Sequence, residues 1–192
     1  AMRVFQHRVG DTPWYFVNAF AANDPESTGQ IWDSAYDRFP GVVRRVAVMN
    51  CRVDRPDRSI TMADACAKWR PADSYIVTGT GTDVFLRRLL DSGIQSDRIE
   101  CVGDAGADEI IDAVAKQPIE STMILGIGNI AGPGMALADF FAGSEPWMPT
   151  VTPATLPANH VLAAQGKRAK FAPELVEARY RWNGSLFRSE SE

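Results

Sequence analysis

The stretch WYFVNAFAANDPESTGQIW, residues 14–32, is an apolar segment that ends abruptly at a polar junction. Residues 14–20 are apolar and aromatic, which is typical of a buried strand. Asp24 and Pro25 favour a helix start, because an aspartate side chain caps backbone amides and proline is tolerated in the first turn. The stretch therefore predicts a strand at 14–20 and a helix at 25–39.

The same alternation of strand and helix continues along the chain. Further strands are predicted at 45–50, 74–79, 98–103 and 122–128, with helices at about 60–69, 82–91 and 107–117. Helical segments of about 10–15 residues between strands are typical of right-handed crossovers and a parallel sheet. We therefore expect an α/β, Rossmann-like domain over residues 1–142, with a mostly parallel sheet flanked by helices.

The composition changes after Gly143. EPWMPTVTPATLP (145–157) contains four prolines in thirteen residues, which favours an extended path, and a short helix is expected at about 172–182. Residues 166–188 carry six basic and two acidic residues. They form either a solvated face or a contact surface for anionic lipid headgroups or an acidic polymer. We therefore treat 143–192 as a separate Pro-rich extension.

The bulk composition excludes several classes of protein. The net charge of −4 gives no indication of nucleic-acid binding. No apolar run approaches the roughly 18 residues of a membrane span, so the chain itself is expected to be soluble. The three cysteines match no metal or redox spacing, and we expect reduced thiols in a cytosol-like compartment. His7 and His160 are expected at the surface, outside the core sheet.

The residues after four predicted strands are polar, small or basic. The strands run into AAND, NCRVDRPDR, TGTGT and GIGNIAG. Parallel strands place their carboxyl ends on one edge of the sheet, where ligands bind. Amides, glycines and arginines at one edge predict a site for an anion, with phosphate as the best fit.

The arginine run is the most distinctive of these segments. Arg52, Arg55 and Arg58 are three residues apart and alternate with Asp54 and Asp57. Guanidinium groups match phosphate or carboxylate bidentately, and the aspartates would orient them or hold a ribose hydroxyl. A surface ion-pair network is the alternative interpretation of the same spacing.

The two glycine-containing segments are weaker signals. TGTGTD offers backbone amides and hydroxyls, or forms only a turn capped by Thr82. GIGNIAG satisfies a loose dinucleotide pattern through Gly126, Gly128 and Ala131, but proline-rich sequence follows where a ribose-binding acid belongs, so we predict no dinucleotide site. The sequence shows no phosphate-binding loop, paired metal ligands or nucleophile elbow, so no metal site and no complete active site are predicted.

Three segments carry a resemblance to a known family. FVNAFAANDPEST, VMNCRVDRPDR and GIGNIAG resemble, in this order, segments in the carboxy-terminal half of poly-γ-glutamate synthase ligase subunits of the PgsB/CapB type. The similarity runs from about Ala1 to Phe141. The order of the blocks more distantly resembles the carboxy-terminal domain of Mur-type ATP-dependent amide ligases. Ala22 replaces the histidine of the Mur pattern, and Ile127 and Asn129 replace its lysine and histidine, so Mur substrate rules do not transfer.

The resemblance implies a domain that closes over a preceding ATPase domain. That family activates a carboxylate as an acyl phosphate, which an amine attacks to form an amide, and it polymerises glutamate into poly-γ-glutamate. ATP and Mg²⁺ are implied as cofactors, held mainly by the central domain that this chain lacks. Glutamate, the growing chain, the ATPase domain and integral-membrane synthase subunits are implied as partners, at the cytoplasmic face of a membrane. We expect the chain to be a truncated piece that is inactive alone.

The resemblance also assigns roles to individual positions. Nucleotide contact falls on Asn23 and Asp24. Charge stabilisation and catalysis fall on Arg52, Asp54, Arg55, Asp57 and Arg58, and substrate binding falls on Thr78, Gly79, Thr80, Gly128 and Asn129. The alternative is a stand-alone, non-catalytic domain that binds a nucleotide or an acidic amino acid through the same loops. With either function, the basic tail would dock on a membrane-bound partner.

Overall fold

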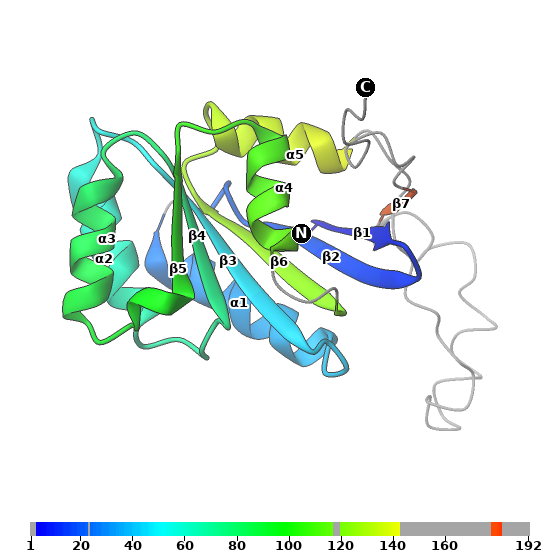
Figure 1. The fold of residues 1–192 in the computed structure, drawn as a ribbon. Coiled ribbons are helices and arrows are strands. Elements are labelled where there is room, and N and C mark those ends of the chain that lie inside the picture. The colour runs from blue at the N-terminus through cyan, green and yellow to red at the C-terminus, as the bar shows by residue number, and fades with distance from the viewer. Residues whose placement is uncertain (1–2, 23, 117–119, 143–177, 182–192) are drawn as a thin grey trace, which may run out of the picture.

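The computed structural model describes residues 3–22, 24–116, 120–142 and 178–181. A sheet of seven strands, in the order β5-β4-β3-β6-β2-β1-β7, forms the centre of the domain (Figure 1). The strands are β1 (Arg3–Val9), β2 (Thr12–Asn18), β3 (Arg44–Cys51), β4 (Ser74–Gly79), β5 (Ile99–Gly103), β6 (Thr122–Gly128) and β7 (Ala178–Arg181). The helices are α1 (Pro25–Arg38), α2 (Pro56–Cys66), α3 (Thr82–Asp91), the 3-10 helix η1 (Ser96–Arg98), α4 (Ala107–Ala115) and α5 (Pro133–Ala142).

The connectivity places β6 in the middle of the sheet. The chain passes from β2 to β3, moves outward through β4 to β5, and returns through α4 to insert β6 between β3 and β2. All pairs from β5 to β2 are parallel, and only the β1–β2 hairpin is antiparallel. The predicted α/β class with a mostly parallel sheet is confirmed.

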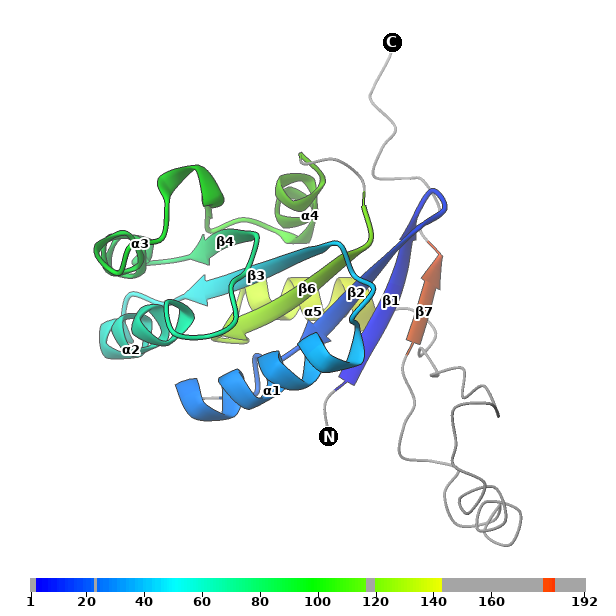
Figure 2. The same ribbon diagram turned by 90° about the horizontal axis from the view of Figure 1, so that it is seen from below.

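Helices cover both faces of the sheet. On one face α1, α2 and α3 bury Trp32, Met62 and Phe85 against the strands. On the other face α4 and α5 bury Ile110 and Phe141. Figure 2 shows α1 and α4 on opposite sides of the sheet. Every residue of β6 is buried, as expected for a central strand that is covered on both faces.

Helix α2 begins earlier than predicted. It starts at Pro56 rather than at about residue 60, because proline at the first helical position fits a helix start directly after a short loop. Asp57 and Arg58 therefore lie in the first turn of a helix and not in a loop. This shift fixes the direction in which Arg58 projects.

Strand β1 was not predicted, and with it the prediction for His7 is wrong. The hairpin turns at Gly10, whose φ of 60° suits glycine, and pairs His7 with Trp14. His7 is 2% exposed and packs near the rings of Trp14, Phe140 and Phe141. Burial lowers its pKa to about 4, so the ring is neutral at pH 7. His160 lies outside the described residues.

The short helix predicted at about 172–182 is wrong for residues 178–181. These residues form β7, which pairs in parallel with β1. The outer edge of β1 presents unpaired backbone groups, and a strand satisfies them where an isolated helix does not. The rest of that segment and the proline-rich run at 145–157 lie outside the described residues.

Two further observations concern the cysteines and the predicted absence of a membrane span. Cys51, Cys66 and Cys101 are all free thiols. Within the described part of the chain, no helix is both long and apolar enough to cross a membrane.

Candidate anion-binding site

An open cleft of about 360 Å³ lies at the carboxyl edge of the sheet. Phe20 follows β2, Arg52 follows β3 and Asn129 follows β6, so residues after three neighbouring strands line the cleft. The lining residues are Phe20, Arg52, Arg55, Arg58, Asn129, Ile130 and Ala131. This is the crevice where the strand order reverses, the usual ligand position in open α/β sheets.

Two of the three arginines share one carboxylate. Arg52 donates to Asp54 through Nε at 2.9 Å and Nη2 at 2.7 Å, and Arg55 Nε lies 4.0 Å from the same carboxylate. The hydrogen bond from Arg52 lowers the pKa of Asp54, so this carboxyl is ionised at neutral pH. These ion pairs agree with both interpretations, because a carboxylate that pairs with the guanidinium groups also orients them.

Arg58 is held differently. Its Nη1 donates to the amide oxygen Oδ1 of Asn129 at 2.9 Å, so its partner is neutral. Arg58 comes from the first turn of α2, whereas Asn129 follows β6. The contact joins two segments that are 71 residues apart in sequence.

Asn50, the penultimate residue of β3, ties the loop after β6 to the sheet. It is fully buried, and its Nδ2 donates to the carbonyl oxygens of Asn129 at 2.6 Å and Ala131 at 2.8 Å. Its own carbonyl accepts the backbone N–H of Asn129 at 3.0 Å. Side chain and backbone of one residue thus set the path of the loop that carries the cleft wall.

Three glycines pack against Asn50. A Cβ added at Gly79 would lie 2.4 Å from Asn50 Oδ1, and one at Gly128 would lie 2.6 Å from its carbonyl oxygen. A Cβ at Gly134 would lie 2.9 Å from Nδ2. Real Cβ contacts do not occur below 3.0 Å, so these positions require glycine. Gly79 and Gly128, at φ values of 90° and 88°, are also in a conformation that favours glycine.

Several predicted site residues do not reach the cleft surface. Thr78 is buried, and its hydroxyl donates to the carbonyl of Gly103 at 2.8 Å. Thr80 Oγ1 accepts the backbone N–H of Val53 at 3.1 Å, which braces the arginine loop. Asp57 is exposed in the first turn of α2 and does not line the cleft. Their predicted ligand contacts remain predictions.

The predicted helix caps have different outcomes. Asp24 is the N-cap of α1, and its Oδ1 accepts the backbone N–H of Ser27 at 2.8 Å. That hydrogen bond lowers the pKa of Asp24. Thr82 does not cap α3, because Gly81 takes the cap position in a left-handed conformation with φ of 67°. Asn23 lies outside the described residues, so the nucleotide contact stays a prediction for both Asn23 and Asp24.

The chemistry of the donors suits phosphate better than metal. Guanidinium forks match phosphate oxygens, so the arginines of the wall carry the kind of donor that a phosphate group accepts from. Among the described residues, no group of three or more His, Cys, Asp or Glu side chains could hold a metal ion such as Mg²⁺. Near the cleft, burial raises the pKa of the Cys51 thiol to about 12, which keeps it protonated and a poor nucleophile.

Sequence reasoning missed Asn50, Phe20 and Ile130. Asn50 had a readable signal, because a carboxamide at the end of a buried apolar strand needs hydrogen-bond partners. Phe20 and Ile130 had none, because apolar residues beside a loop look alike whether they fill a core or line a cleft. A close approach of the Phe20 ring is permitted by Gly126, where an added Cβ would lie 2.5 Å from the ring.

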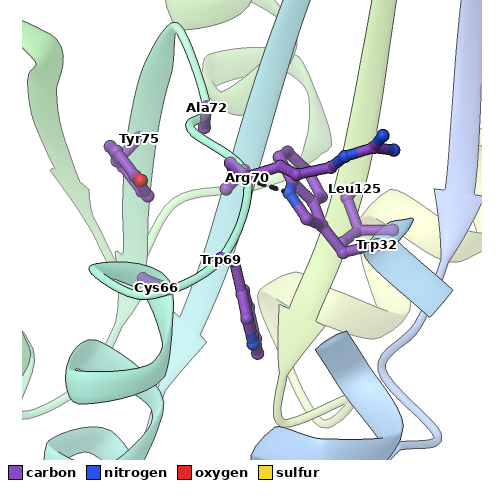
Figure 3. A pocket seen from close by; sticks show the side chains of 8 residues that line it. Trp32, Cys66, Trp69, Arg70, Ala72, Tyr75 and Leu125 are labelled. Carbon is purple, nitrogen blue, oxygen red and sulfur yellow. Dashed lines mark hydrogen bonds between the residues drawn. The ribbon is translucent and has the colours of Figure 1, made fainter. Parts of the chain in front are cut away.

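A second, narrow hollow lies at the other end of α2. Its lining is mostly apolar and has no space for a water molecule. Figure 3 shows Trp32, Trp69 and Tyr75 around it, with the Trp32 indole N–H donating to the Arg70 carbonyl at 2.7 Å. This hollow is part of the packed core and is not a second ligand site.

Two relatives that are similar to this chain in sequence are both CapB proteins. PGA synthase CapB of Bacillus subtilis (strain 168) is 31% identical over 132 residues, which cover 69% of this chain and 33% of that protein. Capsule biosynthesis protein CapB of Bacillus anthracis is 30% identical over 139 residues, covering 72% of this chain and 30% of that protein. The chain thus spans about a third of the length of these curated relatives.

Two solved structures show weaker similarity. The murein peptide ligase mpl from Psychrobacter arcticus 273-4 matches with a TM-score of 0.43 at 15% identity, covering 68% of this chain and 28% of that one. MurF from Acinetobacter baumannii matches with a TM-score of 0.41 at 16% identity, covering 70% and 29%. Neither similarity is strong enough to support an assignment.

The family assignment rests on a family model. The model described as Poly-gamma-glutamate synthase CapB C-terminal domain matches residues 4–144, which include all of the cleft residues. The chain therefore belongs to the family of poly-gamma-glutamate synthase CapB C-terminal domains.

Proposed function

We propose that this chain is the cleft-bearing domain of an ATP-dependent amide ligase that polymerises glutamate into poly-γ-glutamate. The observation that carries the proposal is the set of three arginines at the carboxyl edge of the sheet in a domain of this family. When bound, ATP supplies the phosphoryl group that activates a carboxylate as an acyl phosphate. The preceding domain would hold ATP and Mg²⁺, and this chain would close over them.

The role of this chain is positioning and charge stabilisation. Arginine stays protonated at all relevant pH values, so Arg52, Arg55 and Arg58 bind and orient anions but do not transfer protons. Positive groups held in place before reaction stabilise negative charge that develops during acyl transfer. Glutamate and the growing polymer, both rich in carboxylates, are the substrates of this proposal.

A domain exchange tests the proposal. Residues 4–144 would replace the matched segment of the Bacillus subtilis PGA synthase CapB, and ATP-dependent incorporation of labelled glutamate into polymer would be measured. We expect the chimera to make polymer, and the chimera carrying Arg52→Ala, Arg55→Ala and Arg58→Ala together to lose that activity while remaining folded. Equal polymer synthesis by the triple variant would contradict the proposal.

The isolated chain provides a second test. We expect the purified 192-residue chain to turn over no ATP by itself, because its cleft offers cationic groups but no phosphate-binding loop. ATP hydrolysis that survives repeated purification and disappears in the triple arginine variant would refute this expectation.

The second candidate function is a non-catalytic domain that binds a nucleotide or an acidic amino acid. It is favoured by one observation: the residues of this chain alone form the cleft. The two functions differ in their dependence on a partner domain. Glutamate ligation that appears when a preceding ATPase domain is supplied would exclude the non-catalytic function.

Association with integral-membrane synthase subunits belongs to the same proposal. The basic residues within 166–188 are the proposed docking segment. Deleting residues 145–192 from the protein in its cells should shift it from the membrane fraction to the soluble fraction. Unchanged fractionation would remove the docking role from this segment.

A further inference from the structure

The three cleft arginines differ in what balances their charge. Arg52 faces the Asp54 carboxylate in a bidentate pair, and Arg55 approaches the same carboxylate at 4.0 Å. Arg58 contacts the neutral carboxamide of Asn129, and no ion pair of Arg58 occurs among the described residues. Arg58 is also partly buried, where a charge interacts more strongly than in bulk water.

The carboxamide of Asn129 is locked in the orientation that Arg58 needs. Its backbone N–H and its Nδ2 both donate to the carbonyl of Asn50, at 3.0 Å and 3.5 Å. With the amide nitrogen directed to Asn50, only Oδ1 faces the guanidinium. Asn129 is 7% exposed and Asn50 is fully buried, so neither side chain reorients freely.

We propose that Arg58 is the principal anion-binding residue of the cleft, and that Asn129 and Asn50 are positioning residues that hold its guanidinium without neutralising it. Arg52 and Arg55 each contribute less, because they share the negative charge of Asp54 and their side chains are exposed to water. This inference deepens the proposed function by naming the side chain that meets the anion, and it rests on that function only for the identity of the reacting anion. Anion binding itself is a property of the isolated chain.

The cleft suits a small anion, with one exposed apolar side chain beside the charged wall. Arg58 provides the charge and the 37% exposed Ile130 provides an apolar contact, whereas the Phe20 ring is 2% exposed and presents little surface. Phosphate and carboxylate share the fork geometry that a guanidinium recognises. The phosphate could come from a nucleotide and the carboxylate from an amino acid or polymer, so both chemistries need a probe.

The test is calorimetric titration of the 192-residue chain with two probes, inorganic triphosphate and glutarate. The probe that binds more tightly is the one used for the variants. We expect Arg58→Ala to weaken its affinity by about tenfold or more, the loss typical of a hydrogen bond to a charged group. Arg52→Ala should weaken it by less than about threefold, since a partly neutralised exposed charge contributes little.

A charge change at Asn129 separates binding from structure. Asn129→Asp keeps the size of the side chain and converts its contact with Arg58 into an ion pair. We expect an affinity loss of about tenfold, comparable to losing a charged hydrogen bond. The Tm should fall only slightly, because the new ion pair with Arg58 offsets the lost hydrogen bond from Nδ2 to the Asn50 carbonyl. Gln95→Glu, an exposed change of the same charge before η1, is the control and should leave the affinity nearly unchanged.

The reciprocal variant should act in the opposite direction. Asp54→Asn frees Arg52 and Arg55 and should raise the affinity, whereas the control Asp97→Asn in exposed η1 should not. The proposal is overturned if Arg52→Ala costs as much affinity as Arg58→Ala, or if Asn129→Asp leaves it unchanged. Absence of saturable binding of both probes would also overturn it. None of these outcomes depends on whether the domain exchange yields polymer.

Discussion

Helix α2 has an open, charged cleft at its amino end and a narrow, mostly apolar hollow at its carboxyl end. At the amino end the exposed fractions of the Arg52 and Arg55 side chains are 40% and 53%, so their charges remain accessible. At the carboxyl end Trp32 is 2% exposed, and its indole N–H is hydrogen-bonded. The two ends of α2 therefore serve different purposes. Packing at the carboxyl end stabilises the fold, and the incompletely balanced arginine charge at the amino end favours anion binding.

Trp32→Ala tests the packing end and should have the largest effect. Removing a buried tryptophan leaves a cavity beneath α1 and should lower the free energy of unfolding by about 3–5 kcal/mol. Urea denaturation would measure it. Affinity for inorganic triphosphate should be unchanged where the variant is still folded. A parallel loss of affinity in folded protein would break the separation between the two ends of α2.

Asn50→Ala should affect both properties, because this residue links the core to the cleft. The variant leaves the carbonyl oxygens of Asn129 and Ala131 without their buried donor, which we expect to cost about 2–3 kcal/mol of stability. It also releases Asn129, so anion affinity should fall. Denaturation and calorimetric titration on the same preparation would measure the two effects. A loss of stability with unchanged affinity would mean that Asn50 is structural only.

His7 makes the stability of the fold depend on pH in a region remote from both ends of α2. Folding keeps its pKa at about 4, whereas the unfolded chain has a value near 6.5. Below pH 6.5 the unfolded state therefore takes up a proton that the folded state does not, so stability falls as the pH drops towards 4. At pH 5 the loss should be about 2 kcal/mol.

His7→Leu isolates this contribution. The variant should be about as stable as the parent at pH 7 and more stable relative to it at pH 5, as measured by urea denaturation at both values. The same pH dependence in parent and variant would show that other groups cause it. Anion affinity at pH 7 should be equal in both proteins.

Much of the fold could be predicted from the sequence, because its period is strong. Apolar runs alternate clearly with amphipathic helical segments along the sequence. The structure has β4, α3 and β6 at the predicted residues. The β1–β2 hairpin was missed because RVFQHRV places polar Gln6 and His7 at positions that the structure buries. The start of α2 was missed because the arginine run looks like a loop until Pro56 is recognised as its first residue.

The site could be predicted less fully than the fold. Strand-end reasoning brought Arg52, Arg58 and Asn129 together, because parallel strands share one edge. It could not predict that the three arginines differ in the groups that they contact. Which guanidinium faces a carboxylate and which a carboxamide depends on side-chain geometry between segments 71 residues apart, and no local pattern encodes it.

Asp24→Ala should have the smallest effect, and it compares two helix starts. The amino end of α1 is capped by the Asp24 carboxylate, whereas Arg55 at the start of α2 makes no capping hydrogen bond through its side chain. Because the cap lowers the pKa of Asp24 below its ordinary 3.8, its contribution is present above pH 3.8 and is lost as the pH falls through the lower folded value. Thermal unfolding should show a slightly lower Tm for Asp24→Ala at pH 7, and a smaller difference in acid.

Asp24→Asn is the matched control for this comparison, because asparagine is an equally good N-cap and carries no charge. It should keep the Tm of the parent at pH 7. Neither variant should change the affinity for inorganic triphosphate if Asp24 serves only α1. An affinity that changes in both variants would bring Asp24 into the anion site, extending the cleft from the start of α2 to the start of α1.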